Sequence, residues 1–155
     1  MEQILNSTDF DDIEFCVVSG KMNINYNYLV ALAEKSHNIS VYFNVVRMAE
    51  LMCQCDIAIS GCGSTMYELC HCGLPIITFS FADNRRLGAD AFDEAGVAIN
   101  CCDVRDGIEI VVEAIKETLM RLIKDDELRK EMSEKASCLV DGQGVKRLVN
   151  QILKV

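Results

Sequence analysis

Basic residues, proline and long apolar runs are all scarce in this chain of 155 residues. No apolar run approaches the ~20 residues of a membrane-spanning helix. The first residues lack the basic and then apolar regions of a signal peptide, so we expect a cytoplasmic protein. A formal net charge of -9 argues against a nucleic-acid surface, because phosphate backbones require clustered Lys and Arg. Half of the residues are hydrophobic, which excludes disorder and is enough for one sizeable core.

The chain has nine cysteines, which is an odd number, and its sequence contains no Cys-x-x-Cys motif. Cys53 and Cys55, and likewise Cys70 and Cys72, lie two apart in helix-like segments, where such residues point to nearly opposite sides. That spacing does not suit a metal site. We therefore expect free thiols used as small hydrophobic side chains, with no metal and no cofactor.

Short apolar runs alternate with longer amphipathic ones over the first hundred residues. Five runs are typical of strands, and four intervening segments are typical of helices: 13–20, 39–44, 56–60, 75–81 and 97–100 for the strands, and 27–37, 45–55, 64–73 and 88–96 for the helices. Each strand is a nearly continuous apolar run. The pattern predicts a parallel sheet of about five strands in a Rossmann-like α/β fold of three layers.

The strand signal ends near residue 103. Apolar residues at helical spacing then predict three further C-terminal helices, at 107–123, 125–140 and from 145 onward, with Ile108 placed on the buried face of the first. Residues 1–12 are polar and acidic without a clear period, so we expect a linker or an interdomain crossing rather than core. The nucleotide-binding domain is then expected to cover residues 13–155.

The stretch SGCGST, residues 60–65, follows a strand and precedes a helix. In a parallel α/β sheet, ligands bind at the carboxyl ends of the strands. Glycines allow a close backbone approach and a positive φ, and the following N–H groups with Ser64 and Thr65 could hold a phosphate. The alternative is an ordinary glycine turn in which Ser64 is the N-cap of the helix.

Glu68 follows Ser64 by four residues, which places it one helical turn further along the same face. A carboxylate does not bind phosphate, but it can accept hydrogen bonds from the hydroxyls of a ribose, as an acidic residue does in dinucleotide folds. The alternative is that Glu68 only caps the start of the helix.

These motifs carry a resemblance to a known family. The segment SGCGSTMYELCHCGLPIITFSFADN, residues 60–84, resembles the nucleotide-binding segment in the C-terminal domain of GT-B-fold UDP-sugar enzymes. It is most similar to the UDP-sugar hydrolases of pseudaminic acid synthesis and their spore-coat-polysaccharide relatives, and less so to the peptidoglycan N-acetylglucosaminyltransferase. The segments 17–32, 44–60 and 140–153 extend the resemblance over most of the chain.

The resemblance implies a site for a UDP-sugar. Ser64 and Thr65 would contact the diphosphate and Glu68 the ribose, while the backbone of Asn44 and Val45 would border the uracil. The loop after Gly20, with Asn23 and Asn25, would border the ligand, and Asp83 and Asn84 would face the sugar. The full set of expected contacts is Gly20, Asn44, Val45, Gly61, Cys62, Gly63, Ser64, Thr65, Glu68, Asp83 and Asn84.

Two positions depart from the family pattern. The family usually has glycine in place of Cys62 and often glutamine in place of Arg85. Cys62 puts in question how tightly the loop can close around a diphosphate. Arg85 puts in question the contact to the sugar. Arg85 could instead meet a phosphate or a sugar carboxyl group, or lie solvated beside Arg86.

No residue pair in the chain is suited to activating water. His37 and His71 lie on predicted helices, away from the predicted ligand loops. The resemblance implies that catalytic groups come from an N-terminal GT-B domain, in cis or as a partner subunit, so we expect the chain alone to be inactive. Three functions stay open: the binding domain of a UDP-sugar hydrolase in nonulosonic acid or surface polysaccharide biosynthesis, that of a glycosyltransferase, or a non-catalytic nucleotide-sugar-binding module.

Overall fold

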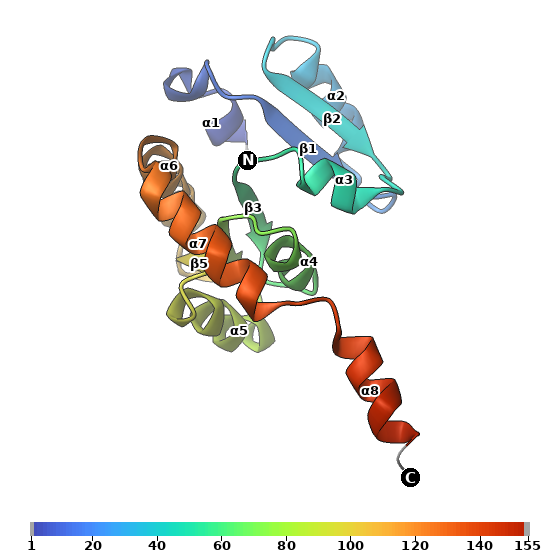
Figure 1. The fold of residues 1–155 in the computed structure, drawn as a ribbon. Coiled ribbons are helices and arrows are strands. Elements are labelled where there is room, and N and C mark those ends of the chain that lie inside the picture. Colours follow the sequence, from blue (N-terminus) through green and yellow to red (C-terminus); the bar gives the residue numbers. More distant parts are fainter. Residues whose placement is uncertain (1, 154–155) are drawn as a thin grey trace. The chain divides into compact units, whose positions relative to one another are not determined.

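A computed structural model describes residues 2–153, which divide into two compact units with the boundary between Glu50 and Leu51 (Figure 1). All five strands are parallel to their neighbours, and helices connect them. The α/β class that the sequence predicts is therefore confirmed. No helix in the described part of the chain is long and apolar enough to span a bilayer.

The N-terminal unit is built around two strands, β1 (Phe15–Ser19) and β2 (Ile39–Phe43), which pair in parallel from Phe15 opposite Ile39 to Ser19 opposite Phe43. Helix α2 (Tyr26–Ala33) connects them. Parallel neighbours require such a crossover, since a tight turn can join only antiparallel strands.

The segment before β1 contains helix α1 (Glu2–Leu5) and the 3-10 helix η1 (Thr8–Phe10). Ile4, Leu5 and Phe10 are at most 4% exposed. The amide of Asn38 donates to the carbonyl oxygens of Phe10 and Ile13, both at 3.0 Å. The expectation that residues 1–12 contribute nothing to the core is therefore wrong, because three apolar side chains without a period suffice to anchor the segment.

The C-terminal unit contains a sheet in the order β3-β4-β5, formed by β3 (Ala58–Gly61), β4 (Ile76–Ser80) and β5 (Ala98–Asp103). Helix α3 (Met48–Met52) precedes β3 in the chain, and the boundary between the two units falls within this helix. The core includes Met66, Cys70, Ile76 and Ile77, each fully buried. The strands thus form sheets of two and three, and not the single sheet of five that we expected. Continuous apolar runs identify strands, but they do not determine which strands pair.

Five helices surround or follow this sheet: α4 (Thr65–His71), α5 (Asp83–Glu94), α6 (Ile108–Lys124), α7 (Asp126–Leu139) and α8 (Gly144–Ile152), with the 3-10 helix η2 (Val104–Asp106) before α6. Helices α5 and α6 pack on β4 and β5, and α4 packs on α7. The three C-terminal helices confirm the sequence prediction. Ile108, however, is 63% exposed, because it lies in the first turn, before α6 reaches the sheet.

Helix α4 ends as the sequence predicts, at a glycine. Gly73 has a φ of 71° and its N–H donates to the Cys70 carbonyl at 3.0 Å, while the N–H of Leu74 donates to Leu69 at 3.1 Å. These two bonds form a Schellman motif, which requires a left-handed residue at the position of Gly73.

Candidate functional site at the carboxyl ends of the strands

The carboxyl ends of β3, β4 and β5 lie at one edge of the three-stranded sheet because the strands are parallel. Gly61, Ser80 and Asp103 are the last residues of the three strands. The loop Cys62–Ser64, which we call the glycine loop, connects β3 to α4 at this edge. The motif thus occupies the position at which α/β folds bind ligands.

Neither glycine of this loop region uses a left-handed conformation, since Gly61 and Gly63 are not among the glycines with positive φ. Of the two properties of glycine considered from the sequence, positive φ is therefore not used here. Space is the constraint at Gly61, where an added methyl carbon would lie 2.8 Å from Cε1 of Phe81. At Gly63 an added methyl carbon would lie 3.9 Å from Nη1 of Arg85, which is ordinary contact.

Cys62 is the position at which the family that the sequence resembles usually has glycine. Its side chain is only 4% exposed and packs on α5, because a methyl group on Gly88 would lie 3.1 Å from its Sγ. Burial raises the pKa of the Cys62 thiol, and the positive charge of Arg85 partly opposes that rise. The side chain therefore fills space between the loop and α5.

Several hydrogen-bond donors of the loop have no partner within residues 2–153. Among the described residues, the backbone N–H groups of Gly63, Ser64 and Thr65 meet no acceptor. Ser64 precedes α4, but its hydroxyl makes no capping hydrogen bond. The hydroxyls of Ser64 and Thr65 are exposed. The alternative in which Ser64 caps the helix therefore lacks its defining bond.

Glu68 lies in the first turn of α4 and its side chain is exposed. No hydrogen bond or ion pair of its carboxylate occurs within residues 2–153. A capping glutamate would bond back to the backbone at the start of the helix, and Glu68 does not. Its carboxylate is thus available to a ligand on the same face as Ser64.

Asp83 and Asn84 open α5, which begins five residues before the predicted start at residue 88. The polar sequence of this turn has no apolar period from which a helix could be predicted. Oδ1 of Asp83 accepts a hydrogen bond from Nη1 of Arg105 at 2.8 Å. Asn84 is exposed beside it.

The sequence analysis missed a polar network at the same edge, formed by Ser80, Asp103 and Arg105. Asp103 is 3% exposed and accepts from the Ser80 hydroxyl at 2.9 Å. Its two oxygens also accept from Nε and Nη2 of Arg105, at 2.9 and 2.8 Å. These hydrogen bonds hold the pKa of Asp103 well below its usual range. The signal in the sequence was the polar residue at the end of each of two neighbouring strands.

A β-bulge creates this network. Thr78 pairs with Asn100, but Ser80 pairs with Asp103, so β5 carries one extra residue over this stretch. Cys102 has a φ of 71° at the irregularity. Bulges redirect side chains near functional sites, and this one turns the Asp103 carboxylate toward Ser80.

The remaining predicted contacts lie in the N-terminal unit, at the carboxyl ends of β1 and β2. Asn44 has a φ of 48° and donates its N–H to the carbonyl of Ser19 at 2.9 Å. Asparagine tolerates this left-handed conformation better than most residues. Gly20 is exposed, and the amide of Asn23 donates to the Ser19 hydroxyl at 3.1 Å. Val45 follows Asn44 and is half-buried.

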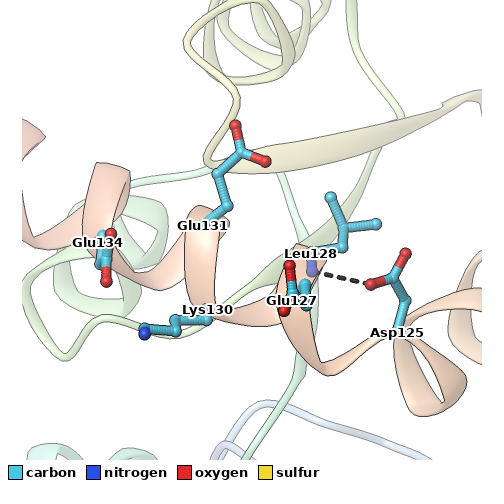
Figure 2. Close-up of a pocket in the computed structure, with 6 residues that line it drawn as sticks. All are labelled: Asp125, Glu127, Leu128, Lys130, Glu131 and Glu134. Atoms are coloured by element: carbon cyan, nitrogen blue, oxygen red, sulfur yellow. Dashed lines mark hydrogen bonds between the residues drawn. The ribbon is translucent and has the colours of Figure 1, made fainter.

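A shallow pocket elsewhere in the C-terminal unit is lined only by helix α7 and the residue before it: Asp125, Glu127, Leu128, Lys130, Glu131 and Glu134. Figure 2 shows that the side chains spread along the helix and do not converge on one point. Asp125 uses its carboxylate as the helix cap, accepting from the Leu128 N–H at 2.9 Å. This pocket contains no part of the glycine loop, and its four carboxylates do not suit an anionic ligand.

The described residues contain no cluster of three or more His, Cys, Asp and Glu side chains that could hold a metal ion. All nine cysteines have free thiols. His71 lies near the end of α4, where Nδ1 is 3.1 Å from the carbonyl oxygen of Val140. His37 is exposed in the connection between α2 and β2.

No family model matches the chain. A curated relative, the spore coat polysaccharide biosynthesis protein SpsG of Bacillus subtilis, is 26% identical over 140 residues, which cover 90% of this chain and 40% of the relative. A solved structure, that of WaaG, a glycosyltransferase involved in lipopolysaccharide biosynthesis, matches with a TM-score of 0.65 and 22% identity over 84% of this chain and 34% of that one.

The chain thus spans about two fifths of the curated relative and a third of the solved structure's chain. It is distantly related to a protein of polysaccharide biosynthesis, and its fold matches that of a GT-B glycosyltransferase.

Proposed function

We propose that the chain is the UDP-sugar-binding domain of an enzyme in surface polysaccharide or nonulosonic (pseudaminic-type) acid biosynthesis. One observation carries the proposal. Three consecutive N–H groups and two exposed hydroxyls at the glycine loop have no partners in the part of the chain that the structure describes, and the loop lies at the carboxyl edge of a parallel sheet. The similarity to a polysaccharide biosynthesis protein supports the same conclusion.

Each group has a role in this proposal. The N–H groups and the hydroxyls of Ser64 and Thr65 hold the diphosphate, so that an acidic chain needs no basic surface. Glu68 accepts hydrogen bonds from the ribose hydroxyls. In the same C-terminal unit, Asp83 and Asn84 contribute to the sugar end, where Oδ2 of Asp83 is not used by Arg105.

Two reactions suit such a domain. Hydrolysis, in which water attacks the sugar carbon and UDP leaves, is supported by the resemblance of residues 60–84 to the UDP-sugar hydrolases. Transfer to an alcohol is supported by the fold match to a glycosyltransferase. In either case the groups that activate the attacking oxygen belong to an N-terminal GT-B domain, in cis or as a partner subunit in the cytoplasm.

Glu68 provides the test, because only a ligand with a ribose diol needs its carboxylate. UDP and inorganic pyrophosphate are titrated into the chain and its Glu68→Ala variant, and amide shifts are followed by NMR. We expect weak UDP binding, with a Kd on the order of 0.1–1 mM. The variant should lose about 1.5–3 kcal/mol for UDP and little for pyrophosphate.

Glu127→Ala is the matched control, since Glu127 is an exposed glutamate in the first turn of α7. It should leave both affinities unchanged. Equal losses for the two ligands in Glu68→Ala, or shifts that map away from residues 60–68, would contradict the proposal.

A further inference from the structure

The side chain of Arg85 lies close to the glycine loop. It is the third residue of α5 and is half-buried. Its Nη1 approaches within 3.9 Å of the position that a methyl group on Gly63 would occupy. Its charge also affects the buried thiol of Cys62, the preceding loop residue. The guanidinium of Arg85 therefore lies against the loop.

No acid in residues 2–153 forms an ion pair with Arg85. The nearest acid along α5, Asp83, pairs with Arg105, and Asp90, five residues after Arg85, accepts from the amide of Asn100 at 2.8 Å. Arg105 is neutralised by Asp83 and Asp103 together. In a chain of net charge -9, a half-buried arginine without a carboxylate partner beside a loop of unpaired N–H groups favours a bound anion.

The chemistry of the guanidinium specifies which anion. Its planar fork matches two oxygens of a phosphoryl group, and such charge-assisted bonds are roughly twice as strong as neutral ones. The N–H groups of Gly63, Ser64 and Thr65 supply the remaining donors. A diphosphate offers enough oxygens to engage both, whereas a neutral nucleoside offers the arginine nothing.

We propose that Arg85 is the cationic contact of this chain for the diphosphate group of its nucleotide ligand and determines its preference for charged over neutral ligands. The inference rests on the proposed function and adds a residue that the family pattern does not supply, since glutamine is common at this position. Arg85 therefore acts on the phosphate end of the ligand, whereas Glu68 acts on its ribose end.

The two roles can be separated with three ligands: UDP, inorganic pyrophosphate and uridine. Each is titrated by NMR into the chain and its Arg85→Ala, Arg85→Lys and Arg86→Ala variants at fixed, low salt. Arg85→Ala should weaken UDP and pyrophosphate about tenfold each and leave uridine unchanged. Arg85→Lys should recover part of the loss, because a point charge remains without the fork.

Arg86→Ala is the matched control, because Arg86 is the adjacent exposed arginine of the same turn. The substitution removes the same net charge as Arg85→Ala. It should change each affinity less than twofold. Dispersed amide spectra confirm that each variant is folded, and Arg85→Lys serves in place of Arg85→Ala if the alanine variant is not.

The outcomes distinguish the two proposals. If UDP causes no saturable shifts in the unmodified chain, both the UDP site and the role of Arg85 are wrong. If UDP binds at residues 60–68 but Arg85→Ala behaves like Arg86→Ala, only the role of Arg85 is overturned. A loss for UDP without one for pyrophosphate would also overturn it, because the contact would then not be with the phosphates.

Discussion

The guanidinium of Arg105 donates two hydrogen bonds to the carboxylate of Asp103, with Nε 2.9 Å from Oδ1 and Nη2 2.8 Å from Oδ2. The third nitrogen, Nη1, reaches Asp83 at the start of α5. Two elements from different parts of the chain, the end of β5 and the first turn of α5, are thereby joined at the edge of the sheet. The buried carboxylate of Asp103 thus helps to position Asp83, a residue of the proposed site.

The first prediction concerns pH and Asp103. Its pKa is depressed in the folded chain, mainly by the hydrogen bonds from Arg105. A depressed pKa contributes stability above the unfolded value of about 4, and that contribution is lost as the pH falls below it. Asp103→Asn should therefore lower the Tm by several degrees at pH 7, and the difference from the unmodified chain should shrink from pH 4 downward.

Thermal unfolding followed by circular dichroism between pH 7 and pH 2.5 measures this difference. Asp106→Asn is the control, since Asp106 is an exposed neighbour in η2 and should change the Tm little at any pH. A Tm difference for Asp103→Asn that stays constant down to pH 2.5 would show that the ion pair contributes no pH-dependent stability.

The second prediction concerns Gly73, at the end of α4. Its φ of 71° is strained for any residue with a side chain, and an added methyl would lie 2.8 Å from Oγ of Ser137. Gly73→Ala should cost about 1–2 kcal/mol of unfolding free energy from the backbone alone. Gly144→Ala, at an open position without positive φ, should change it by less than about 0.5 kcal/mol.

Urea denaturation of both variants gives the comparison. If the two substitutions have the same effect on the midpoint, the left-handed helix end is not required for stability, and the assignment of Gly73 to the Schellman position is wrong.

Local patterns in the sequence were enough to locate most of these elements. Helices α6 and α7 begin and end within a residue or two of their predicted limits, because apolar spacing and the acidic cap at Asp125 are local signals. Gly73 was predicted as a helix end for the same reason. The glycine loop was located because its glycines, Ser64 and Thr65 lie between a predicted strand and a predicted helix.

Features that depend on distant residues could not be predicted in this way. The bulge at Cys102 is set by how β5 packs on β4, and nothing in the local sequence marks it. The network of Asp103 and Arg105 follows from that bulge and was missed with it, because polar residues at the ends of two strands do not by themselves show that their side chains meet. Strand pairing and the burial of Phe10 likewise depend on tertiary contacts that have no period along the chain.

The third prediction concerns the reactivity of the cysteines. Cys70 is fully buried, and burial raises its pKa to about 11. At pH 8 its thiolate is therefore on the order of one molecule in a thousand. Iodoacetamide at pH 8 should modify the exposed Cys16 and Cys138 within minutes and leave Cys70 unmodified until urea is added. Mass spectrometry of the digested chain measures each site, and labelling of Cys70 at the rate of Cys138 would contradict its burial.

The last prediction concerns Asn38, which hydrogen-bonds the segment before β1 to the residues that precede β2. Its amide is 8% exposed and donates to the carbonyl oxygens of Phe10 and Ile13. Asn38→Ala leaves both carbonyls without this donor in a partly or fully buried setting, so it should cost about 2–3 kcal/mol. Asn27→Ala, at an exposed position on α2, should cost less than about 0.5 kcal/mol.

Hydrogen exchange localises the effect of Asn38→Ala. The Ile13 N–H donates to the Phe10 carbonyl at 3.0 Å, so its protection reports whether this segment is closed. In Asn38→Ala the Ile13 amide should exchange at least tenfold faster, because opening the segment no longer breaks one buried and one partly buried hydrogen bond. Unchanged exchange there, together with unchanged stability, would mean that Ile4, Leu5 and Phe10 hold the segment without the help of Asn38.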